Sequence, residues 1–125
     1  MPDAGFRGPK QIYQAMKWSF KGLKATYVAE ASFRMEIYLC VILFPLAFWL
    51  AQSPIELILL IGSCLLVLLI EIINSAIEAV VDLICGEERH ELAGRAKDMG
   101  SAAVFMAQMI VLLVWGIIGY ENFIA

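Results

Sequence analysis

Residues 71–98 read EIINSAIEAVVDLICGEERHELAGRAKD, a hydrophobic helical pattern that carries acidic side chains and then becomes a charged loop. At about 100° per residue, four polar residues spaced i, i+3, i+7 and i+11 fall within an arc of roughly 80° on a helix. They are Glu71, Asn74, Glu78 and Asp82, and we call them the polar stripe. A charged side chain at the centre of a membrane helix costs roughly 2.5 kcal/mol or more. Several on one helix therefore indicate a functional site.

The polar stripe allows more than one interpretation. Carboxylates at helical spacing could hold a metal ion, conduct protons or act as acid and base. The alternative is a polar seam that is hydrogen-bonded between packed helices. The spacing alone leaves these alternatives open.

The composition indicates an all-α integral membrane protein with a single domain. Hydrophobic residues make up 62% of the 125 residues, whereas soluble domains contain roughly 45–50%. Three membrane helices bury little surface against one another, which favours a homo-oligomer. Cys40, Cys64 and Cys85 follow no metal-ligand spacing. We expect them to be small buried hydrophobic residues without a disulfide.

The hydrophobic pattern predicts four helices and one charged connection. We expect a surface helix over 10–27, membrane spans over 29–51, 55–84 and 96–119, and a cytoplasmic loop over 85–95. Gly86 is a natural stop for the second span. Gly94 and Gly100 are expected to let the third span approach a neighbouring helix closely.

The predicted surface helix has two faces. Its apolar residues, Ile12, Met16, Phe20, Leu23 and Tyr27, share one face, and Lys10, Lys17, Lys21 and Lys24 line the other. This pattern is typical of an amphipathic helix that lies in the membrane interface, where lysines meet anionic lipid. A nucleic-acid partner is disfavoured in so hydrophobic a chain.

The basic residues predict the orientation in the membrane. All nine lie either in the segment that ends at Arg34 or between Arg89 and Lys97. By the positive-inside rule, the N-terminus and the second loop are cytoplasmic and the C-terminus is outside. Trp115 and Tyr120 suit the opposite interface. The polar stripe then opens toward the cytoplasm, where nucleotides are found.

These side chains suit divalent-metal and phosphate chemistry. Carboxylates hold Mg²⁺ while phosphates and water fill its other positions. Lys97 could neutralise phosphate oxygens, and a carboxylate near the apolar zone could accept a proton from a lipid hydroxyl. The sequence has neither a G-x-x-x-x-G-K-[ST] loop nor a protein-kinase glycine-rich motif. Phosphoryl transfer is therefore one candidate activity, without a common nucleotide-binding fold.

Two long motifs add a family resemblance. They are EIINSAIEAVVD over 71–82 and HELAGRAKDMGSAAV over 90–104, supported by KGL over 21–23 and EASFR over 30–34. Together they closely resemble the prokaryotic diacylglycerol kinase family over most of the chain. Members of that family are small three-span proteins that form homotrimers in the bacterial inner membrane. They use MgATP to convert diacylglycerol to phosphatidic acid, and the resemblance implies the same here.

The resemblance also implies a role for individual residues. Glu71 is expected to be the general base and to contact the lipid substrate, and Glu30 and Glu78 to hold Mg²⁺. The expected ATP-binding residues are Asn74, Glu88, Arg89, His90, Lys97 and Asp98, and Phe33, Arg34 and Ser101 are expected to border the lipid. The family's surface helix has a basic residue that aligns with Gln11, and Lys10 is the nearest substitute.

Three other interpretations remain. Undecaprenol kinase, a related branch of the family, performs the same chemistry on a polyprenol, but the HEL stretch over 90–92 resembles the diacylglycerol branch. A small proton-coupled exporter would also carry membrane glutamates, but it would need neither a lysine–aspartate pair at a cytoplasmic mouth nor a basic surface helix. A purely structural membrane protein ranks last.

Because three helices cannot enclose a site that also needs a lipid entrance, we expect active sites that are shared between subunits.

Overall fold

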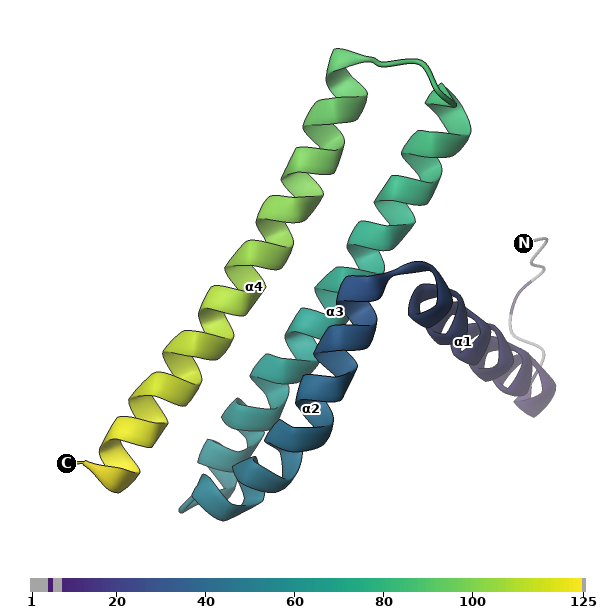
Figure 1. Cartoon of the computed structure of the whole chain (residues 1–125). Coiled ribbons are helices and arrows are strands. Elements are labelled where there is room, and N and C mark those ends of the chain that lie inside the picture. Colours follow the sequence, from purple (N-terminus) through teal and green to yellow (C-terminus); the bar gives the residue numbers. More distant parts are fainter. Residues whose placement is uncertain (1–4, 6–7, 125) are drawn as a thin grey trace.

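The computed structural model describes residue 5 and residues 8–124, and four helices account for nearly all of them. They are α1 (Pro9–Ala29), α2 (Ala31–Leu50), α3 (Pro54–Cys85) and α4 (Glu91–Phe123). In Figure 1, α2, α3 and α4 run alongside one another, and α1 leaves this bundle at a steep angle. The three bundle helices are long and apolar enough to cross a membrane. The chain is therefore an all-α membrane protein.

A sharp bend at Glu30 separates α1 from α2. The first membrane span was expected to run through this residue, but Glu30 has extended backbone angles of φ −116° and ψ 114°. Arg34 Nη1 donates hydrogen bonds to the carbonyl oxygens of Tyr27 (2.7 Å) and Val28 (3.0 Å). The last carbonyls of a helix need such partners. Arg34 therefore stabilises the end of α1.

Local signals set both ends of α3. Ser53 precedes the helix, and its Oγ accepts a hydrogen bond from the Glu56 amide at 3.2 Å. Pro54 is the first helical residue, a position where its missing N–H costs nothing. At the other end, Gly86 takes a positive φ of 57°, as expected for a glycine stop. The next helix, α4, begins at Glu91, five residues before the predicted span. The prediction placed these charged residues in the loop, but they form the first turn of the helix.

The hydrophobic core lies near the α2–α3 turn. It contains Ala47, Leu50, Leu60 and Ile118, from all three bundle helices. Trp115 Nε1 donates to the Leu60 carbonyl at 3.1 Å, so this indole packs against α3. Tyr120 is exposed.

Hydrogen bonds of one polar side chain also join the three helices at this end of the bundle. Asn122 Nδ2 donates to the Leu50 carbonyl at 2.8 Å and to Glu56 Oε1 at 2.7 Å. In a membrane, polar groups must find partners within the protein. Asn122 thus ties α4 to the ends of α2 and α3.

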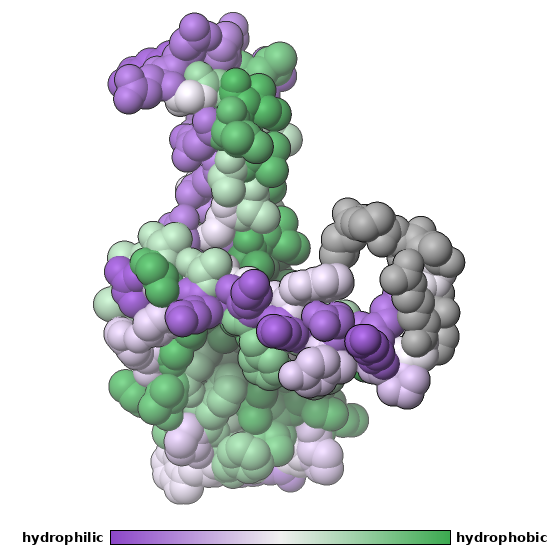
Figure 2. Space-filling view, turned by 90° about the vertical axis from the view of Figure 1, so that its right-hand side faces the viewer, coloured by the Kyte–Doolittle hydropathy of each residue, from purple (hydrophilic) through white to green (hydrophobic). Residues whose placement is uncertain are grey.

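The opposite end is much more open. The α3–α4 hairpin extends well beyond the start of α2 (Figure 1). Every residue from 72 to 99, all of which the structure describes, is at least partly exposed. We call residues 72–99 the hairpin arm. Figure 2 shows hydrophilic residues along α1 and on one edge and the tip of this arm, with hydrophobic residues over much of the remaining surface.

Candidate active site

Glu71 is the most buried residue of the polar stripe, with 3% of its surface exposed. It lies on α3 at the level where α2 begins, and Ser32 Oγ donates a hydrogen bond of 3.1 Å to its Oε2. Burying a carboxyl group is costly unless hydrogen bonds compensate. Glu71 is therefore buried in the packing between α2 and α3, where Ser32 compensates part of that cost.

One turn further along α3, Asn74 and Glu78 form a second polar contact. Asn74 Nδ2 donates to Glu78 Oε1 at 3.3 Å. The carboxyl group of Glu78 also interacts with that of Glu30, at the bend between α1 and α2. The structure thus brings together the two carboxylates for which a metal role was predicted.

Gly100 of α4 packs directly against Asn74. A Cβ atom at position 100 would overlap Asn74 Oδ1 and lie 3.1 Å from its Cγ. Asn74 Oδ1 is buried without a hydrogen-bond partner among the described residues. The predicted close approach is confirmed for Gly100, whereas a Cβ at Gly94 would meet no atom of the described residues of this chain within 4 Å.

Two carboxylates of the site, those of Glu30 and Glu78, have the chemistry to hold a divalent metal ion. Within residues 8–124, no group of three or more His, Cys, Asp or Glu side chains is placed to hold a metal by itself. Glu30 and Glu78 supply two carboxylates, which are hard oxygen ligands. Mg²⁺ typically uses one or two protein carboxylates and completes its shell with substrate phosphates and water.

Lys97 lies across from the end of the polar stripe. Its Nζ is 2.7 Å from Asp82 Oδ1, and the two side chains are 44% and 62% exposed. Lys97 is also close enough to Glu78 to act on its charge. Exposed ion pairs contribute only about 0–1 kcal/mol, so a phosphate group could replace Asp82 at little cost.

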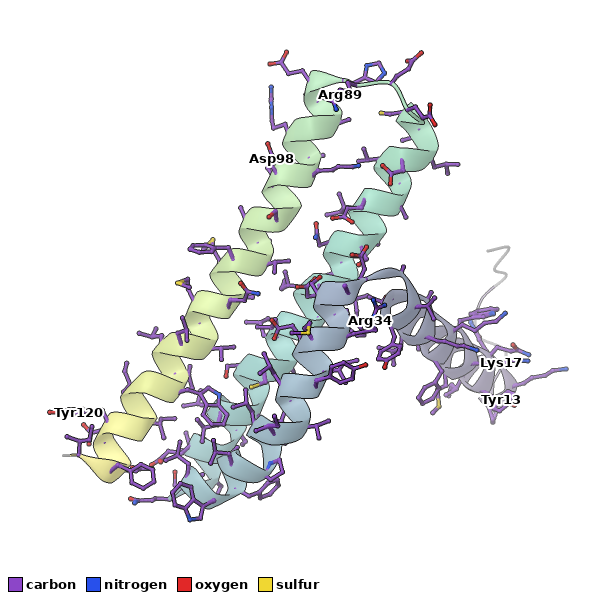
Figure 3. All side chains as sticks on the ribbon, in the orientation of Figure 1. Tyr13, Lys17, Arg34, Arg89, Asp98 and Tyr120 are labelled. Atoms are coloured by element: carbon purple, nitrogen blue, oxygen red, sulfur yellow. The ribbon has the colours of Figure 1, made fainter. Side chains whose placement is uncertain are left out.

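The predicted nucleotide loop lies at the tip of the hairpin arm. Glu88 and His90 are exposed, with His90 Nε2 3.3 Å from Glu88 Oε2. Figure 3 shows Arg89 at this tip and Asp98 on the side of α4 that faces away from α3. Ser101 is also exposed. The single chain therefore does not bring Asp98 to Glu71.

The residues expected to border the lipid have different surroundings. Phe33 is 2% exposed. It lines a largely apolar groove of about 590 Å³ between α1, α2 and α3, together with Leu23, Tyr27 and Leu65. Arg34 lies at the bend, with its guanidinium carbon 6.0 Å from the centre of the Tyr27 ring.

Several contacts near the site were not foreseen. Besides Ser32, Gln108 Nε2 donates to Glu36 Oε1 at 3.2 Å. The hydroxyl oxygens of Tyr27 and Tyr38 are 2.7 Å apart, and this hydrogen bond raises the pKa of Tyr27. Gln108, a polar residue inside an apolar span, carried a usable signal. The contact of Ser32 with Glu71 depends on how α2 packs against α3, so the sequence carried no signal for it.

Comparison with known proteins identifies the family. Residues 17–119 match the family model described as prokaryotic diacylglycerol kinase. The diacylglycerol kinase of Haemophilus influenzae is 52% identical over 109 residues, which cover 87% of this chain and 92% of the relative. That of Escherichia coli K12 is 47% identical over 116 residues (93% and 94%), and that of Pseudomonas aeruginosa 45% over 117 residues (94% of each). The chain belongs to the prokaryotic diacylglycerol kinase family.

Proposed function

We propose that this protein is an ATP-dependent diacylglycerol kinase of the bacterial cytoplasmic membrane. It transfers the γ-phosphate of ATP to the free hydroxyl group of diacylglycerol and produces phosphatidic acid. The observation that carries this proposal is the buried, hydrogen-bonded Glu71 beside the Glu30–Glu78 carboxylates, in a chain of this family. The hydroxyl group of diacylglycerol lies at the membrane, so its base must be a residue that the membrane part of the protein carries.

Glu71 is the general base of the proposed reaction. Its carboxylate takes the proton of the lipid hydroxyl while the hydroxyl oxygen forms a bond to the γ-phosphorus of ATP. The bond between that phosphorus and the bridging oxygen breaks, and ADP leaves. Proton transfer by a positioned group typically contributes about 10²–10⁴-fold to a rate. The burial of Glu71 keeps bulk water away from the carboxylate that accepts the lipid proton.

Three residues hold the metal end of the nucleotide in this proposal. Glu30 and Glu78 bind Mg²⁺, and Asn74 holds Glu78 through the 3.3 Å hydrogen bond. The ion, when bound, neutralises charge on the phosphate oxygens. The proximity of the Glu30 and Glu78 carboxyl groups supports this assignment.

The phosphates and the base of ATP contact the hairpin arm. Lys97 releases Asp82 and binds phosphate oxygens through charge-assisted hydrogen bonds. The exposed loop residues Glu88, Arg89 and His90 contact the nucleoside. The exposure of this loop supports the assignment, since a soluble nucleotide must reach it from water.

The active form is a homotrimer whose sites are shared between neighbouring subunits. Asp98 lies on the side of α4 away from α3 (Figure 3), and Ser101 is exposed as well. Asp98 therefore does not reach the Glu71 of its own chain. In a symmetric assembly, α4 of one subunit would present them to α3 of the next.

The amphipathic α1 lies at the cytoplasmic surface of the membrane. It leaves the bundle at a steep angle, and Tyr13 and Lys17 project from it away from the other helices (Figure 3). Its lysines meet anionic headgroups, each contributing about 1 kcal/mol. The N-terminus and the α3–α4 loop are then cytoplasmic and the C-terminus is periplasmic.

The decisive test is a phosphorylation assay with purified protein. The protein is supplied with radiolabelled ATP and mixed micelles that contain diacylglycerol or undecaprenol at equal mole fraction. Labelled phosphatidic acid should form at least tenfold faster than labelled polyprenyl phosphate. A preference for undecaprenol would assign the chain to the polyprenol branch. No labelled lipid from either acceptor would leave the exporter alternative standing.

The metal assignment has its own test. Replacing Glu78 by Gln should raise the Mg²⁺ concentration needed for half-maximal activity by about tenfold or more, because one charged ligand is lost. Glu121→Gln, at an exposed position near the other end of α4, is the matched control and should leave that concentration unchanged. An unaltered requirement in Glu78→Gln would remove this residue from the metal site.

A further inference from the structure

Ser32 is the second residue of α2, directly after the bend at Glu30. Its hydroxyl group donates to Oε2 of Glu71 across the interface between α2 and α3. We propose that Ser32 is a positioning residue for Glu71: it holds one carboxylate oxygen so that the other faces the lipid hydroxyl. This inference rests on the proposed kinase function and on Glu71 being its base.

The position of Ser32 is fixed from two sides. On the N-terminal side, Arg34 holds the end of α1 and so defines where α2 begins. One turn further along the same face of α2, Glu36 accepts a 3.2 Å hydrogen bond from Gln108 of α4. These two contacts keep α2 in register with the bundle. The part of α2 that carries Ser32 is therefore placed by contacts other than the one with Glu71.

In this proposal the two carboxylate oxygens of Glu71 have different partners. A hydroxyl group has one hydrogen to donate, and the described hydrogen bond of Glu71 uses Oε2. Oε1 is then the atom that accepts the proton of the lipid hydroxyl. A glutamate side chain without such a partner can rotate about three bonds, and this rotation lowers the fraction of time that it spends in a reactive geometry. A proton acceptor that is oriented before the substrate arrives avoids this loss.

Ser32 acts on catalysis and not on binding, which makes its role measurable. Alanine has nearly the same size and suits a helix at least as well, so Ser32→Ala removes the hydrogen bond with little change in packing. We expect kcat to fall about tenfold, the size associated with losing a hydrogen bond to a charged group. KM for ATP and for diacylglycerol should each change less than twofold. Ser32→Thr keeps the hydroxyl group and should restore kcat to within threefold of the wild type.

Ser63→Ala is the matched control. Ser63 is a buried serine of α3 whose hydroxyl donates to the Leu60 carbonyl of its own helix at 2.9 Å. This variant should leave kcat unchanged. Thermal unfolding of all variants in the same detergent establishes that equal amounts of folded protein are compared. In a Glu71→Gln background, Ser32→Ala should change the residual rate less than twofold, because its effect passes through Glu71.

The outcomes separate this inference from the proposed function. If wild-type protein phosphorylates no lipid, the kinase proposal fails before Ser32 is considered. If wild type is active and Ser32→Ala has wild-type kcat, the positioning role is wrong and the kinase proposal stands. A loss in Ser32→Ala that Thr does not rescue, or one that persists undiminished in the Glu71→Gln background, would also overturn it.

Discussion

Substituting Gly100 by Ala tests the close contact between α3 and α4 at the site. The added Cβ would overlap Asn74 Oδ1, so the asparagine side chain must move. Moving it breaks the hydrogen bond from Asn74 to Glu78. The variant therefore reports on both the packing of the helices and the support of a proposed metal ligand.

The expected change in the free energy of unfolding of Gly100→Ala has three contributions. Overpacking a tight contact costs about 2 kcal/mol, and losing a hydrogen bond costs about 1 kcal/mol. Alanine in place of glycine gains about 1 kcal/mol in a helix interior. We expect Gly100→Ala to lower the free energy of unfolding by about 2 kcal/mol. Its phosphorylation rate should fall at least tenfold.

Equilibrium unfolding of the purified protein in mixed micelles measures the stability, and the radiolabel assay measures the rate. Gly116→Ala on the same helix is the matched control, because a Cβ there would meet no described atom within 4 Å. It should be as stable as the wild type or up to about 1 kcal/mol more stable.

A double substitution tests whether the contact between Gly100 and Asn74 causes the loss of stability. Asn74→Ala removes the atoms that the new Cβ would strike. In that background Gly100→Ala should cost at least about 1.5 kcal/mol less than it does alone, because neighbouring sites couple. An equal cost in both backgrounds would show that the contact between Gly100 and Asn74 is not the cause.

Three further predictions concern catalysis, topology and assembly. Glu71→Gln should retain less than about a tenth of the activity while nucleotide binding is largely spared; a more active variant would rule out its role as base. In a background without the native cysteines, a cysteine at position 52 in place of Gln52 should react with an impermeant reagent from outside, and one in place of Glu91 only from the cytoplasm. The opposite pattern would put the carboxylates on the side without ATP. Mixing inactive Glu71→Gln subunits with inactive Asp98→Asn subunits should restore activity, provided that differently tagged chains co-purify; exchanged oligomers that stay inactive would place all these groups within one subunit.

The periodicity of the sequence predicted the features that one helix determines by itself. The polar stripe is one of them, because the spacing from Glu71 to Asp82 fixes a helical face whatever packs against it. The ends of α3 are another, since Ser53–Pro54 and Gly86 act through their own backbone and side chains. The structure adds which neighbours this face meets.

Features that depend on contacts between segments could not be predicted. The bend at Glu30 has no glycine or proline to mark it, and it is stabilised by Arg34 contacts with α1 carbonyls. The hydrogen bond from the Trp115 indole on α4 to the Leu60 carbonyl on α3 is another such contact. Asp98 was assigned to the site through the family motif, and a single chain offers it no route to Glu71.

The hairpin arm has a consequence for how the protein matures in the cell. No residue from 72 to 99 is fully buried in the chain, whereas a core of buried residues near the α2–α3 turn already joins its three bundle helices. In the proposed trimer, a newly inserted subunit would pack that end of its bundle by itself, and the half with the proposed nucleotide site would be completed by a second copy. Catalytic competence would then appear only on assembly, and an unassembled chain would remain a silent precursor that consumes no ATP.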